Sequence, residues 1–289
     1  MKKQYSVLAI GVISVSFAAI FIRLADAPSL VIAAWRLCLA ALILAPFAIT
    51  LSGSELRRVS RKKLVMMLLA GGFLALHFGL WITSLSYTSV ATSVVLVTAT
   101  PIFVAVASYL LFKEKLTFKI IMGIIISIGG SILIGYGNWT IGTNPLIGAG
   151  LALAGALAVA GYLLIGRRIR RTTGLLSYTF ITYSTAAVLL LITALASGYS
   201  LSGYSGNTYL MFVLLALIPQ ILGHSSLNWS LKFMPATMVT IAVLGEPIIA
   251  TILAFFILNE SPTLTEIIGG VLILGGIFIA FRGNKILTD

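Results

Sequence analysis

Charged side chains and cysteines are scarce in this sequence. Only 9% of the 289 residues are charged, whereas a soluble domain of ordinary composition carries about a quarter. The single cysteine, Cys38, lies inside an apolar run, which excludes a disulfide framework and a cysteine-based metal cluster. A nucleotide-binding glycine loop, paired carboxylates and a His-Glu-x-x-His motif are also missing. These absences argue against an ATP-driven pump and against an enzyme, and they predict no cofactor and no bound metal.

Apolar residues dominate instead, at 60% of the chain. They form many runs of about 20 residues without a charge, which is the length that crosses the hydrocarbon of a bilayer. A transmembrane barrel would show shorter, alternating segments. The sequence therefore predicts an all-α membrane protein with ten transmembrane helices and very short loops. The expected spans are 5–22, 30–51, 64–87, 90–112, 118–137, 145–166, 175–197, 208–231, 234–257 and 263–282.

The basic residues gather in alternate loops between these spans. With the N-terminus inside, the inner segments hold 17 of the 19 lysines and arginines. This bias is what the positive-inside rule produces, and it predicts cytoplasmic N- and C-termini. It also explains the net charge of +12 without a nucleic-acid partner. We expect a multi-pass protein of the cell (inner) membrane whose first apolar run is a retained helix, because a second span follows it at once.

The chain contains one unit twice, at an offset of 146 residues. The stretch VVLVTATPIFVAVASYLLFKE at 94–114 is similar to TIAVLGEPIIATILAFFILNE at 240–260. Matched residues within and beyond these stretches are Pro101 and Pro247, Glu114 and Glu260, Gly123 and Gly269, and Gly130 and Gly276. The glycines recur at seven residues, which places them on one helical face and favours close helix packing.

Each half of the chain contains five predicted spans. Because five is odd, the second copy must enter the membrane in the opposite sense. Inverted repeats of this kind are typical of secondary transporters, in which two similar halves move around a fixed site near the midplane. We therefore predict two inverted five-helix repeats, at 1–139 and 140–289.

Two prolines interrupt predicted spans at equivalent places. Pro101 and Pro247 each remove a backbone hydrogen bond and are expected to bend their helices, which membrane proteins tolerate where the freed groups face protein or water. Glu114 and Glu260 end these spans near the surface, and we interpret them as structural.

Polar side chains form a stripe on each of two equivalent spans. His77, Trp81 and Ser84 recur at i, i+4 and i+7 in the third span. In the eighth span, Gln220, His224 and Asn228 recur at i, i+4 and i+8. Such spacing aligns the groups on one helical face. A central cavity between the halves explains both stripes, although each histidine taken alone is also compatible with ordinary packing.

Two ionisable residues lie at membrane depth, where a charge is expensive and must face protein or water. Glu246 is about 12 residues, roughly 18 Å, from the inner end of its span. We interpret it as a candidate for proton coupling and solute binding; a protonated carboxyl bonded to a neighbouring helix is the alternative. Arg36 lies below the outer end of the second span, where it can line the cavity or extend to the headgroups.

The sequence resembles the EamA-like transporter family of the drug/metabolite transporter superfamily. The resemblance is carried by PIFVAVASYLLFKE at 101–114, GEPIIATILAFFILNE at 245–260 and AAWRL around Arg36, within a five-plus-five repeat of spans. It extends over nearly the whole chain. It implies a ten-helix inner-membrane carrier with two inverted repeats, a central cavity and efflux of small metabolites, often amino acids or their relatives.

The function expected from the sequence is secondary transport by alternating access, with export of amino acids or related compounds. An importer of the same build is the near alternative. A membrane-embedded enzyme and a passive channel belong to different functional classes, and neither an evident nucleophile nor a selectivity filter supports them. The expected partners are a small-molecule substrate and the bilayer, and the protein is expected to be a monomer or a homodimer.

Overall fold

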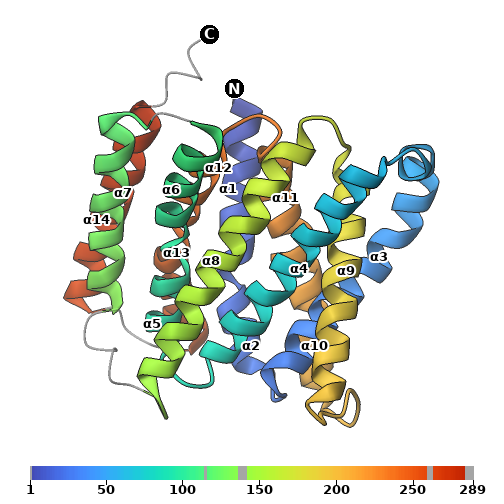
Figure 1. Ribbon diagram of the computed structural model, residues 1–289. Helices are drawn as coiled ribbons and strands as arrows, with labels where there is room; N and C mark the ends of the chain where they lie inside the picture. Colours follow the sequence, from blue (N-terminus) through green and yellow to red (C-terminus); the bar gives the residue numbers. More distant parts are fainter. Residues whose placement is uncertain (1, 114–115, 136–141, 259–262, 284–289) are drawn as a thin grey trace.

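The chain folds into a bundle of helices that run roughly along one common direction (Figure 1). The computed structural model describes residues 2–113, 116–135, 142–258 and 263–283. The helices are α1 (Lys2–Ser16), α2 (Ala18–Leu24), α3 (Ser29–Arg57), α4 (Arg61–Ser84), α5 (Val90–Val97), α6 (Thr100–Phe112), α7 (Phe118–Gly135), α8 (Pro145–Arg170), α9 (Leu175–Ala196), α10 (Gly206–Leu215), the π-helix η1 (Ala216–His224), α11 (Ser225–Ser230), α12 (Ala236–Val243), α13 (Glu246–Leu258) and α14 (Leu264–Arg282).

All ten predicted spans correspond to helical segments. Within the described residues, nine segments are long and apolar enough to cross a membrane, and the shorter apolar helix Ile267–Arg282 is the tenth. The largest difference in length is at α3, which continues to Arg57 instead of ending at residue 51. Its last turns are polar, so they extend the helix out of the hydrocarbon. The prediction of an all-helical membrane protein is confirmed.

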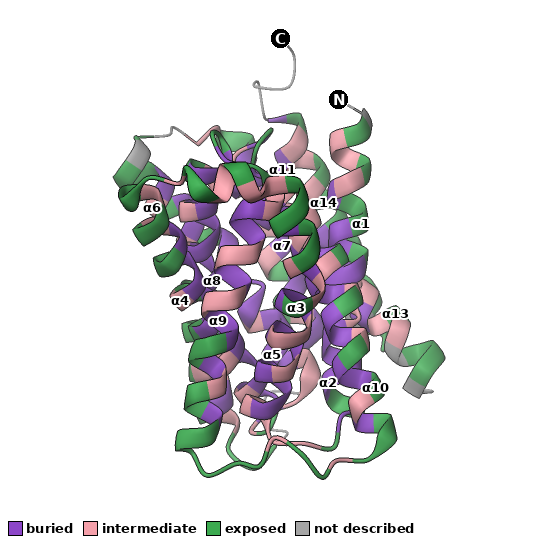
Figure 2. Ribbon diagram, turned by 90° about the vertical axis from the view of Figure 1, so that its right-hand side faces the viewer, coloured by how far each residue is buried: buried purple, intermediate pink, exposed green. Residues whose placement is uncertain are grey.

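The outer faces of the bundle are apolar. Leu146, Phe118 and Phe256 are 83%, 75% and 73% exposed, and Figure 2 shows buried residues gathered inside a shell of exposed ones. Exposed apolar surface on this scale marks contact with a membrane rather than with water.

The basic residues gather at one end of the bundle. The start of α1, the end of α14, and the turns α3–α4 and α8–α9 all lie at this end (Figure 1). We call it the basic end. Its described lysines and arginines include Lys3, Arg57, Arg58, Arg61, Lys62, Lys63, Arg167, Arg168, Arg170, Arg171, Lys232 and Arg282.

A glycine seam joins α7 to α14 across the two halves. A Cβ atom added at Gly123 would lie 2.5 Å from the Gly276 carbonyl oxygen, and one at Gly130 would lie 2.5 Å from the Gly269 carbonyl oxygen. Only glycine allows two helix backbones to approach so closely. The order of the contacts makes the helices antiparallel. Gly123 meets Gly276, the repeat equivalent of Gly130, and Gly130 meets Gly269, the repeat equivalent of Gly123. A two-fold axis between the repeats requires this exchange.

A second pair of helices, α3 and α9, is held together by hydrogen bonds near both ends. At the basic end, the Glu55 carboxylate accepts hydrogen bonds from the Gly174 N–H, at 2.7 Å, and from the Ser177 hydroxyl. It therefore caps the N-terminus of α9 from another helix. At the opposite end, the Trp35 indole N–H donates to the Leu201 carbonyl oxygen at 3.0 Å. Both contacts join the first half of the chain to the second.

Two spans are interrupted at equivalent positions. The helix stops after Val97 and restarts at Thr100, and it stops after Val243 and restarts at Glu246. Pro101 and Pro247 are the second residues of the helices that restart. Because Pro101 has no N–H to offer the Val97 carbonyl oxygen, the Thr100 hydroxyl donates to it instead, at 2.7 Å.

Three predictions concern residues outside the described part of the chain. They are the structural roles of Glu114 and Glu260 and the boundary between repeats at 139/140. The matching glycines and the matching interruptions are consistent with two inverted repeats on either side of that boundary.

The glycine seam yields a direct test. Gly130→Ala should lower the free energy of unfolding by about 1–3 kcal/mol, because the new methyl group would overlap a backbone carbonyl that cannot move aside. The matched control is Gly129→Ala, whose Cβ meets nothing within 4 Å. Thermal unfolding of both variants in detergent measures the difference. Equal melting temperatures for the two variants would contradict the close approach of α7 and α14.

Candidate functional site

A small cavity lies between the two halves of the chain, with a volume of about 60 Å³. A water molecule needs roughly 10–15 Å³ on this scale, so the space suits a few waters or a small solute. Its lining comes from both halves: Val15, Ala18, Arg36, His77, Trp81, Val97, Thr98, Thr100, Val159, Leu163, His224, Leu227, Thr240, Val243 and Glu246.

Several lining residues occupy equivalent positions in the two repeats. The pairs separated by 146 residues are Val97 and Val243, Thr100 and Glu246, and Trp81 and Leu227. The cavity is therefore symmetric in its positions and asymmetric in its chemistry. A threonine and a tryptophan face it from one repeat, while a carboxylic acid and a leucine face it from the other.

The interrupted spans supply the polar edge of this cavity. Thr98 and Thr100 lie at one interruption, and Val243 and Glu246 flank the other. Non-helical backbone at membrane depth is tolerated only where protein or a cavity surrounds it. The two breaks thus explain how polar residues reach the centre of otherwise apolar spans.

Arg36 is fully buried, at 0% exposure, and lines the cavity. Its Nε donates to the Gln220 Oε1 atom at 2.9 Å, and its Cζ lies 4.0 Å from the centre of the Phe78 ring. Its two terminal nitrogens have no hydrogen-bond partner in the described part of the chain. A buried guanidinium with free donors is costly unless something satisfies it, so the cavity is where an acceptor is expected.

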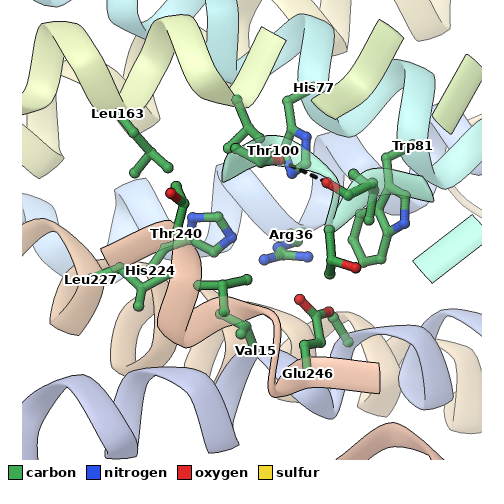
Figure 3. Close-up of a pocket in the computed structure, with 15 residues that line it drawn as sticks. Val15, Arg36, His77, Trp81, Thr100, Leu163, His224, Leu227, Thr240 and Glu246 are labelled. Atoms are coloured by element: carbon green, nitrogen blue, oxygen red, sulfur yellow. Dashed lines mark hydrogen bonds between the residues drawn. The ribbon is translucent and has the colours of Figure 1, made fainter. Parts of the chain in front are cut away.

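Glu246 lines the same cavity and is 7% exposed. In Figure 3 its carboxyl group points toward the guanidinium of Arg36. The two residues come from helices far apart in the sequence, α3 and α13. Together they place a guanidinium group and a carboxyl group at the same small cavity.

An aromatic wall completes the site. The His77 and Trp81 rings are stacked, with centroids 5.8 Å apart and planes inclined by 6°. His77 Nδ1 donates to the Gly155 carbonyl oxygen at 3.0 Å, since a carbonyl can only accept. His224 lies 6.3 Å from His77 between ring centroids. The Trp81 indole N–H and His224 Nδ1 have no hydrogen-bond partner in the described residues.

Three predicted cavity residues do not line the cavity. Gln220 holds Arg36, Asn228 donates to the Tyr162 and Tyr183 hydroxyls, and Ser84 bonds to Ser93. Gln220 diverges from His224 because residues 216–224 form a π-helix, whereas Asn228 lies in the α-helix α11 that follows it. The wider turns of the π-helix close with i→i+5 bonds, so an i, i+4 spacing no longer marks one face.

Sequence reasoning missed several lining residues. Thr100 is the most informative, because subtracting the repeat offset of 146 from Glu246 leads directly to it. Val97 and Val243, which also line the cavity, are related by the same offset. Val15, Ala18 and Thr240 have no comparable signal, since small and apolar residues occur throughout the spans.

The cavity side chains offer groups that bind a small solute. No group of three or more metal-binding side chains occurs among the residues that the structure describes. The available functions are charge, hydrogen bonding and an aromatic surface.

The contact between Arg36 and Gln220 can be tested by a double-mutant cycle. Gln220→Leu should lower the free energy of unfolding by about 1–3 kcal/mol, because a buried charged donor loses its acceptor. Adding Arg36→Leu should recover part of this loss, since no buried charge then remains. Reversible unfolding in mixed micelles gives the values, with Gln4→Leu as the control. Additive effects of the two substitutions would contradict the interaction.

Comparison with known proteins agrees with this architecture. The model of the EamA-like transporter family matches residues 2–136 and 146–282. The uncharacterized transporter YdfC of Bacillus subtilis is 27% identical over 257 residues, 88% of this chain and 82% of the relative. An uncharacterized transporter of Clostridium kluyveri is 28% identical over 71% of this chain and 68% of its own length.

The fold has also been seen in a crystal structure of another protein. It superposes with a TM-score of 0.78 at 17% identity, covering 98% of this chain and 97% of that one. At this identity the likeness concerns the fold alone. The family matches extend over both halves and most of the chain. This chain therefore belongs to the EamA-like transporter family of the drug/metabolite transporter superfamily, and it is a membrane transporter rather than an enzyme.

Proposed function

We propose that this transporter is a secondary carrier that exports amino acids or closely related small compounds by alternating access. One observation carries the proposal: a cavity between the two halves is lined by Arg36 and Glu246, which come from different helices and are directed into the same space (Figure 3). Export is the direction that the family resemblance implies. The proposed setting is the cytoplasmic membrane, with the basic end on the cytoplasmic side.

The two charged groups suit the two ends of an amino acid. The free nitrogens of Arg36 form a planar fork that matches a carboxylate. Ionised Glu246 attracts an ammonium group. A cavity of about 60 Å³ favours a small amino acid in this closed state.

Alternating access follows from the inverted repeats. A solute bound between two similar halves is exposed to one side when one set of contacts opens, and to the other side when the equivalent set opens. Glu246, Arg36, His77, Trp81 and His224 are the proposed solute-binding residues. Gln220 is proposed to position Arg36.

Counterflow into proteoliposomes tests the substrate class. Alanine should exchange, whereas ethylamine and propionate, which each keep one end of the molecule, should not. Arg36→Gln and Glu246→Gln should each raise the half-saturating alanine concentration at least tenfold, because each removes a charge-assisted interaction of about 1.5–3 kcal/mol. Arg168→Gln and Asp26→Asn, which change exposed charges outside the cavity, are the matched controls. Equal exchange of ethylamine and alanine would contradict a carboxylate-binding role for Arg36.

The proton role of Glu246 has its own test. Protonation of Glu246 removes the charge that attracts an ammonium group, so wild-type alanine exchange should fall as the pH on both sides is lowered together. Residual exchange by Glu246→Gln should be independent of pH, while Glu246→Asp should keep a pH dependence. Counterflow between pH 5 and pH 8 measures all three. A Glu246→Gln profile with the wild-type shape would show that another group takes up the proton.

A further inference from the structure

A polar cleft of about 350 Å³ opens at the basic end of the bundle, away from the central cavity. It lies between the α3–α4 turn and the α8–α9 loop, and so between the two halves of the chain. Its lining is Ser54, Glu55, Arg58, Val59, Ser60, Lys63, Thr172 and Thr173. Four hydroxyl groups and two cations thus surround one space.

The one acid in the cleft is already engaged. Glu55 accepts hydrogen bonds from the Gly174 N–H and the Ser177 hydroxyl, so its charge offsets the positive pole of α9. Arg58 and Lys63 form no ion pair within the described residues. The two cations outnumber the single carboxylate, so the cleft keeps a net positive charge.

A buried hydroxyl also reaches this space without a partner. Thr173 is 6% exposed and lines the cleft. Its carbonyl oxygen accepts from Arg170, but its hydroxyl has no hydrogen-bond partner in the part of the chain that the structure describes. Because Thr173 lines the open cleft, its hydroxyl can donate to a ligand oxygen or to water.

The start of α4 increases the demand for an anion. The helix begins at Arg61 and carries Arg61, Lys62 and Lys63 in its first turn, where acidic residues are absent. Cations at a helix N-terminus oppose the helix dipole and repel one another. An anion in the adjacent cleft would offset both effects.

We propose that this cleft binds the phosphate group of an anionic phospholipid. Arg58 and Lys63 supply the charge, and the hydroxyls of Ser60, Thr172 and Thr173 donate to the phosphate oxygens. The lipid is favoured over a free anion because the cleft lies where α3 and α8 end and α4 and α9 begin, at the level of the headgroups. Basic clefts between membrane helices recognise lipid headgroups in this way. The bound lipid joins the two halves of the chain at one end of the bundle.

Native mass spectrometry of the purified full-length protein, titrated with phosphatidylglycerol, phosphatidylcholine or inorganic phosphate, tests the proposal. Wild type should retain phosphatidylglycerol in preference to phosphatidylcholine. One basic residue near anionic lipid contributes about fivefold in affinity, so Arg58→Gln/Lys63→Gln should weaken binding about 30-fold. The matched control, Arg168→Gln/Lys232→Gln, removes two exposed cations of the same end outside the cleft and should change binding less than threefold.

The remaining outcomes are equally decisive. An equal loss in both double variants would overturn the proposal, because it would mean that lipid binding follows overall charge. Saturable binding of inorganic phosphate that excludes phosphatidylglycerol would identify a free-anion site and would overturn the lipid assignment. Thr173→Val, which removes the buried hydroxyl without changing charge, should weaken phosphatidylglycerol binding by severalfold. An unchanged affinity in this variant would show that the Thr173 hydroxyl does not contact the lipid phosphate.

Discussion

A fully buried guanidinium is the constraint on which the site depends. Arg36 cannot be placed among apolar helices at low cost, because removing a charge from water is unfavourable unless other groups replace the lost hydration. Gln220 provides one hydrogen bond and the Phe78 ring provides a face. Two nitrogens are left for the cavity. The π-helix contributes Gln220 and α4 contributes Phe78, so both elements help to accommodate this charge.

The two repeats give the cavity matching positions but different chemistry. Thr100 and Glu246 occupy equivalent places beside equivalent helix breaks. A hydroxyl and a carboxylic acid nevertheless interact very differently with an ammonium group or a proton. In the proposed alternating-access cycle, equivalent backbones would allow the halves to exchange roles as the protein opens to one side and then the other. In the proposed function, the difference between the two side chains would set the orientation of a bound solute.

Much of the fold could be predicted from the sequence, because long apolar runs and alternating basic loops are strong signals. The ten spans, the inverted repeat and the interruptions near Pro101 and Pro247 all depend on such patterns. Arg36 and Glu246 were found because ionisable residues are rare at membrane depth. Gln220 lies off the cavity lining, because a helical stripe assumes α-helical turns and nothing in the sequence pattern reveals a π-helix. Asn228 instead faces the Tyr162 and Tyr183 hydroxyls, which its own segment does not determine. The inward direction of Thr98 and Thr240 depends on how the broken helices pack, which no single segment determines.

The glycine seam between α7 and α14 has a consequence for the origin of the chain. Gly123 meets Gly276 and Gly130 meets Gly269, so each contact is the image of the other under the repeat offset. An interface of this kind, in which the same patch is used on both sides, is the isologous contact of a two-fold dimer. A separate five-helix polypeptide with these glycines would carry a surface complementary to itself, provided that its copies inserted in opposite directions. The seam is thus the arrangement expected if two such subunits, already paired in opposite orientations within a bilayer, were later joined into one chain.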